Sequence, residues 1–168
     1  VSRVRAVDSG PLSRFYRFAI AHSRQGMLEA VELRRILEPQ FARLAATRRT
    51  ADDLARLRSI LAAMEAALGK PAWMEADLSF HEHLAAMTHN RLIMLQSKGL
   101  EPIVREMMIR FGSRLPRSVV DWRATFGRHE RIAAAIASGD PTASEEAMRQ
   151  HFEAAEEAIA EIYGKHAE

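Results

Sequence analysis

Apolar residues recur along most of the chain at the three- and four-residue spacing of amphipathic helices. In residues 27–46, for example, the apolar stripe consists of Leu28, Val31, Leu37, Phe41 and Leu44. No segment after residue 9 shows the two-residue alternation of a sheet strand. The pattern therefore predicts an all-α protein, an antiparallel bundle of six or seven helices.

Glycine, proline and capping residues predict where these helices begin and end. We expect helices over residues 10–22, 27–46, 51–68, 71–89, 91–110, 118–138 and 141–163. Thr50 with Asp53 resembles a capping box, and Asp140 is a candidate N-cap before Pro141. Gly99 and Pro102 predict a kink or break in the fifth helix.

The first seven residues differ from the rest, because they alternate apolar with serine or arginine (VSRVRAV). This alternation predicts the end of a strand that enters from a preceding element. The expected organisation is therefore a linker or strand end over residues 1–9, followed by one domain over residues 10–168.

Composition narrows the possible chemistry. The 168 residues fit one compact domain, and 48% apolar with 27% charged residues is typical of a globular protein. No cysteine is present, so a metal would have to be bound by His, Asp or Glu. No apolar run approaches the roughly 20 residues of a membrane span, so we expect no membrane association and a cytoplasmic location.

Four residues have the spacing of a metal site. Asp77 and His81 are four positions apart and project from one face of a predicted helix. His129 precedes the predicted turn at Gly139 and His151 follows it, each by a helical length of about 15 Å. In an antiparallel hairpin the two histidines would lie at the same level, and three imidazoles with one carboxylate suit a divalent first-row metal.

Spacing alone leaves other interpretations open. An Asp and a His four positions apart also form an ordinary helix pair, and single histidines are usually surface or core residues. The sequence His81-Glu82-His83 is not a zinc-protease motif, because its two histidines point to different faces. We expect the remaining histidines to be solvated or locally bonded, namely His22, His83, His89 and His166.

Several separated motifs occur in a characteristic order. They are residues 32–38 (ELRRILE), 77–81 (DLSFH), 129–132 (HERI) and 148–151 (MRQH), with Asn90 and Gly139-Asp140 between them. In type and spacing they resemble the FadR-like C-terminal (FCD) effector-binding domain of GntR-family transcription regulators, over roughly residues 10–163. The resemblance is to the metal-bearing branch of that family rather than to its acyl-CoA-binding member.

The resemblance implies a site inside the helical bundle. Its metal would lie at the base of an internal cavity, bound by the four residues already singled out: Asp77, His81, His129 and His151. Zinc is the expected ion, with nickel, manganese and iron as alternatives. Arg34 matches the arginine that the family places near its effector, and a guanidinium suits a carboxylate. The alternative for Arg34 is a surface pair with Glu38.

The implied function is that of an effector-sensing domain that binds a small organic acid at the metal, not of an enzyme. Such regulators carry an N-terminal winged helix-turn-helix, so residues 1–9 would be its linker or last wing strand. The expected partners are a carboxylic-acid effector, a second copy of the chain in a homodimer, and DNA only through the N-terminal module. The alternatives are a purely structural metal and a metal-dependent enzyme.

Overall fold

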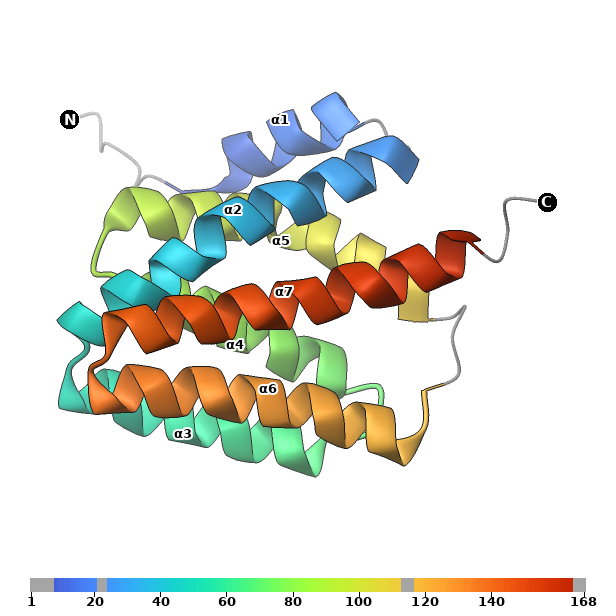
Figure 1. Ribbon diagram of the computed structural model, residues 1–168. Helices are drawn as coiled ribbons and strands as arrows, with labels where there is room; N and C mark the ends of the chain where they lie inside the picture. Colours follow the sequence, from blue (N-terminus) through green and yellow to red (C-terminus); the bar gives the residue numbers. More distant parts are fainter. Residues whose placement is uncertain (1–7, 21–23, 113–116, 165–168) are drawn as a thin grey trace, which may run out of the picture.

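The computed structural model describes residues 8–20, 24–112 and 117–164. These residues form seven α-helices, and none of them lies in a strand (Figure 1). In chain order the helices are α1 (Gly10–Ile20), α2 (Arg24–Arg48), α3 (Ala51–Ala66), α4 (Trp73–Met87), α5 (Arg91–Gly112), α6 (Val119–Ser138) and α7 (Pro141–Gly164). The predicted all-α fold with six or seven helices is therefore confirmed. The strand predicted at residues 1–7 lies outside the described residues.

Local capping interactions fix several helix ends as the sequence predicted. The Thr50 hydroxyl accepts a hydrogen bond from the Asp53 amide at 3.1 Å, and the Asp53 carboxylate accepts one from the Thr50 amide at 2.8 Å. Ser118 begins α6 with the same reciprocal arrangement. The Asp140 carboxylate accepts hydrogen bonds from two backbone amides of the first turn of α7.

Two predicted helix starts were wrong, and the break expected in the fifth helix is absent. Helix α2 begins at Arg24, so Gly26 lies in its first turn rather than before it. Pro71 lies in the turn before α4, which begins at Trp73. Helix α5 continues through Pro102 without the expected break. Buried residues on both sides of Pro102, including Leu100 and Val104, anchor the two halves of α5 against the same core, and this packing outweighs the local preference for a break.

Helix α4 lies inside the bundle and contacts α2, α3 and α5. Nine of its fifteen residues are buried, and Glu75, Ser79 and Glu82 form a narrow polar stripe along its outer side. In front of it, α6 and α7 lie side by side, with α3 next to α6 and α2 next to α7 (Figure 1). Asp77, His81 and His83 lie on the buried side of α4, where the burial of a polar group is costly unless a partner compensates it.

Candidate metal and effector site

Two of the predicted site residues, Asp77 and His81, project from the buried helix α4. Asp77 is 8% exposed and His81 is 5% exposed, although both have ionisable side chains. The Asp77 Oδ2 atom lies 3.9 Å from Nε2 of His81. This separation is too long for a hydrogen bond, so the two residues face a common space rather than pairing with one another.

His129 on α6 and His151 on α7 meet across the hairpin that joins these helices. Gly139 ends α6 in the left-handed conformation, with φ of 78°, and α7 starts two residues later. The two imidazole rings lie at the same level, with centroids 4.6 Å apart. The level match inferred from their distances to the turn is therefore confirmed.

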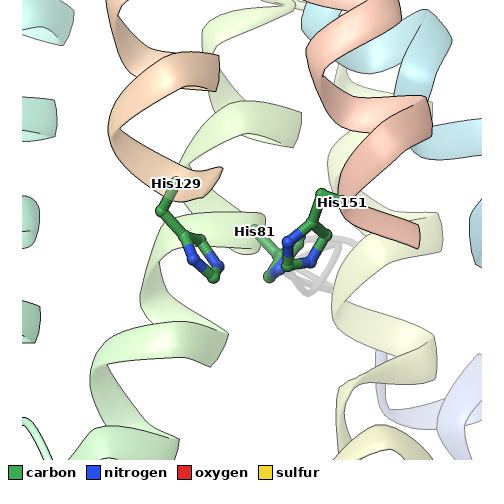
Figure 2. Close-up of side chains that lie close together, drawn as sticks. All are labelled: His81, His129 and His151. Atoms are coloured by element: carbon green, nitrogen blue, oxygen red, sulfur yellow. The ribbon is translucent and has the colours of Figure 1, made fainter. Parts of the chain in front are cut away.

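Figure 2 shows the three imidazoles pointing toward one another from three helices. The ring centroid of His81 is 5.7 Å from that of His129 and 5.2 Å from that of His151. One nitrogen of each ring lies within 4.8 Å of the others. Asp77 joins them, because its Oδ1 atom lies 3.1 Å from Nε2 of His129. We refer to these four residues as the His/Asp cluster.

The charge state of the cluster follows from its surroundings. Burial acts to raise the pKa of Asp77, but the contact with His129 and the nearby His81 and Arg34 outweigh it and lower the pKa to about 2. Asp77 is therefore ionised. Burial, together with the neighbouring His129 and His81, lowers the pKa of His151 well below its ordinary value. His151 is therefore neutral at pH 7 and has a lone pair available.

Two nitrogen atoms of the cluster lack partners. The Nδ1 atom of His129 lies 2.9 Å from the backbone carbonyl oxygen of Thr125. A carbonyl can only accept, so Nδ1 donates this hydrogen bond, and Nε2 is the ring atom left to face the cluster. Neither this Nε2 atom nor Nδ1 of His151 has a hydrogen-bond partner among the described residues. Buried polar atoms of this kind call for an explanation, such as an ion.

A divalent cation fits this donor set. Neutral imidazole nitrogens and an ionised carboxylate are ligands of zinc and of other first-row metals. Nε2 of His129 and Oδ1 of Asp77 lie 3.1 Å apart, close enough for both atoms to bind one cation. Aromatic rings shield the site on one side, since Phe80 lies edge-on to His129 with centroids 4.8 Å apart.

Arg34, the predicted effector residue, is buried rather than at the surface. Its Nε atom donates to Oε1 of Glu38 at 2.5 Å, and both side chains are about 10% exposed or less. The pair with Glu38 that the sequence allowed therefore exists, but its expected surface position was wrong. The guanidinium also lies over the ring of Phe152, at 5.3 Å from its centroid.

A small cavity opens beside the cluster. Its volume is about 30 Å³, and Arg34, Glu38 and His81 contribute to its lining. Further lining residues come from α5, among them Gln96, Ser97 and Lys98. Small-molecule pockets usually occupy roughly 300–1,000 Å³, so this cavity has room for water but not for an organic acid.

Glu38 is the site residue whose position the sequence did not predict. Its Oε2 atom lies 2.5 Å from Nδ1 of His81. Its spacing from Arg34 gave a local signal for the ion pair, whereas the contact with His81 joins residues 43 positions apart and depends on how α2 crosses α4.

Of the other histidines, His83 bonds the backbone carbonyl of Asp53 and His89 bonds its side chain.

The sequence model of the FCD domain family matches residues 29–154. The chain is 29% identical over 144 residues to the Uxu operon transcriptional regulator of Escherichia coli, covering 82% of this chain and 55% of that protein. It is 28% identical over 162 residues to the HTH-type transcriptional regulator LutR of Bacillus subtilis, covering 90% and 68%. These relatives are transcriptional regulators, not enzymes, in agreement with the expectation from the sequence.

The fold is also similar to that of Streptococcus agalactiae GntR, with a TM-score of 0.64 and 23% identity, covering 90% of this chain and 60% of that one. The chain thus spans between about half and two thirds of the length of these proteins. The family match extends from α2 into α7 and includes all four members of the His/Asp cluster. The chain therefore belongs to the FCD domain family.

Proposed function

We propose that this chain is the effector-sensing domain of a cytoplasmic GntR-family transcription regulator. It binds a divalent metal through Asp77, His81, His129 and His151, and a small organic acid through the metal and Arg34. The observation that carries the proposal is the His/Asp cluster itself. Nε2 of His129 and Nδ1 of His151 have no hydrogen-bond partner among the described residues, and Nε2 of His129 lies 3.1 Å from the Asp77 carboxylate. Arg34 and His81 both line the adjacent cavity.

The chemistry of a carboxylate effector fits these residues. A bound metal supplies positive charge and exchangeable coordination positions for a carboxylate or hydroxyl oxygen. Arg34 supplies a fork of donors for a carboxylate, although Glu38 already occupies its Nε atom. Because the cavity is small, the acid enters only as α5 moves away from α2 and α4, and this movement supplies the conformational signal.

The remaining parts of the proposal concern the whole regulator. An N-terminal winged helix-turn-helix would read the DNA, and two chains would pair so that two such modules meet two half-sites. Part of this is suggested by the relatives' names, since LutR is called HTH-type and the matched Uxu protein is called an operon regulator. Sedimentation that gives only monomer at tens of micromolar would count against pairing through this domain alone.

Metal content tests the proposal directly. Protein purified without chelators should contain about one divalent ion per chain, by elemental analysis. His151→Ala should lose most of it and unfold at a lower temperature, because a ligand that binds only the folded state stabilises that state. His89→Ala is the control for metal content and should keep its ion, since His89 lies outside the cluster and pairs with Asp53. Metal-free wild-type protein, or full occupancy in His151→Ala, would contradict the proposed site.

Two alternatives give different results. A purely structural metal would be closed to solvent, whereas His81 lines a cavity that opens beside the cluster. Competing small acids should therefore change the visible spectrum of a cobalt-substituted protein only if the metal has exchangeable positions. A metal-dependent enzyme would also place a general base beside its metal. Among the described residues that line the cavity near His81, the buried carboxylate, Glu38, is already held by Arg34 and His81.

A further inference from the structure

The side chain of Glu38 connects the two halves of the proposed site. One of its carboxylate oxygens accepts a hydrogen bond from Nε of Arg34, at 2.5 Å. The other lies 2.5 Å from Nδ1 of His81. Glu38 is 6% exposed, and its two partners are similarly buried, so solvent does not compete for these contacts. A single carboxylate from α2 therefore holds both a cavity-facing guanidinium and a ring of the His/Asp cluster.

The charge on Glu38 decides where the His81 proton lies. One oxygen of Glu38 accepts a hydrogen bond from the Arg34 guanidinium, which is always charged, and a carboxyl group in such an ion pair is ionised. An ionised carboxylate can only accept hydrogen bonds, so Nδ1 of His81 must be the donor. In the neutral ring, Nε2 then carries the lone pair. This is the atom that faces Asp77, at 3.9 Å from its Oδ2.

We propose that Glu38 is a positioning residue that fixes the proton of His81 on Nδ1, so that Nε2 is presented to the metal, and that the same carboxylate links this ligand to Arg34. The inference rests on the proposed metal site and adds a residue outside the four ligands. Histidine ligands commonly donate their second nitrogen to a carboxylate, which fixes the ring and strengthens its binding to the metal.

Replacing Glu38 with glutamine should reverse this arrangement. The guanidinium of Arg34 can only donate, so the glutamine carbonyl oxygen would turn toward it. The amide nitrogen, also a donor, would then face Nδ1 of His81. Nδ1 would have to accept, and the proton would move to Nε2, the atom that the metal needs. Glu38→Gln therefore keeps the volume of the side chain and inverts the tautomer of His81.

The first experiment uses metal-free protein, and its decisive result comes from the wild type, so that it depends neither on metal binding nor on the folding of a variant. Long-range ¹H–¹⁵N correlation spectra of the histidine rings report which nitrogen carries the proton. We expect the proton of His81 on Nδ1 in the wild type and on Nε2 in Glu38→Gln. A wild-type His81 ring protonated on Nε2 alone would overturn the proposal.

The second experiment titrates the same proteins with Co²⁺ in competition with a chromophoric chelator. We expect Glu38→Gln to bind Co²⁺ about 10–100-fold more weakly than the wild type. Glu145→Gln is the matched control, because Glu145 pairs with Gln40 and Arg43 at the surface and contacts no member of the cluster in these pairs, so it should bind as the wild type does. Equal Co²⁺ affinity of wild type and Glu38→Gln would refute the role of Glu38 and leave the metal site standing. No Co²⁺ binding by the wild type would refute the metal site and this role with it.

Discussion

Arg34 and Glu38 form an ion pair inside the protein, with Nε 2.5 Å from Oε1 and both side chains about 10% exposed or less. A helix pair of this spacing on a surface contributes only a few tenths of a kcal/mol. Inside the protein, removal of one partner leaves a buried charge without compensation, which typically costs about 3–5 kcal/mol. The position of the pair therefore changes what a substitution at Arg34 should do.

We expect Arg34→Ala to lower the melting temperature and to abolish the binding of small hydroxy- and dicarboxylic acids. Arg34→Lys should keep more of the stability but restore binding only partly, because an ammonium group cannot reproduce the geometry of the guanidinium. Arg35→Ala is the control, since Arg35 is exposed and pairs with Glu156 at the surface. A thermal-shift screen of these acids against the four proteins is the measurement. Equal binding by wild type and Arg34→Ala would remove Arg34 from the effector site.

Gly139 should be sensitive to substitution. Its φ of 78° is left-handed, and a Cβ atom there would lie 2.4 Å from the guanidinium of Arg49. We expect Gly139→Ala to destabilise the fold by about 1–2 kcal/mol. Gly127, within the same helix α6, has no atom within 4 Å of the Cβ position, so Gly127→Ala should stabilise the fold by about 0.5–1 kcal/mol. Urea unfolding of metal-free protein measures both, and two effects of the same sign would contradict this account.

The capping box of α3 should make part of the stability depend on pH. Burial acts to raise the pKa of Asp53, but hydrogen bonds from Thr50 and the contact with His89 outweigh it and lower the pKa below its ordinary value. A carboxyl whose pKa is lower in the folded state stabilises that state above its unfolded pKa, near 3.9. This contribution is lost as the pH falls through the folded-state pKa.

We therefore expect Asp53→Asn to be less stable than the wild type at pH 7, with a difference that shrinks as the pH falls below about 4. Thr50→Ala should cost about 1 kcal/mol, because the backbone amide of Asp53 loses its acceptor. Urea unfolding between pH 2.5 and 7 measures the difference, with Asp52→Asn as the control from the same helix turn. A wild-type advantage over Asp53→Asn that stays constant down to pH 2.5 would argue against the ionised cap.

The features that could be predicted from the sequence are those decided by neighbours along the chain. Thr50 with Asp53 and Asp140 with Pro141 act within one turn, so their side chains identified the helix starts. The level of His129 and His151 followed from their equal distances to one turn. By contrast, the continuity of α5 through Pro102 depends on packing against other helices. The contact of Glu38 with His81 depends on how two helices cross, for which neither residue carries a local signal.

The part of α5 that lines the cavity also contacts α1, the first helix of the domain. Gln96 of α5 lines the cavity and exchanges hydrogen bonds with the hydroxyl group of Tyr16 on α1, at 2.6–2.9 Å. Three residues further along α5, Gly99 lets Leu12 of α1 approach so closely that a Cβ atom would lie 2.7 Å from its side chain. Because of these contacts, a displacement of α5 in this region would also displace α1. The position of α1 would therefore depend on how α5 packs around the cavity.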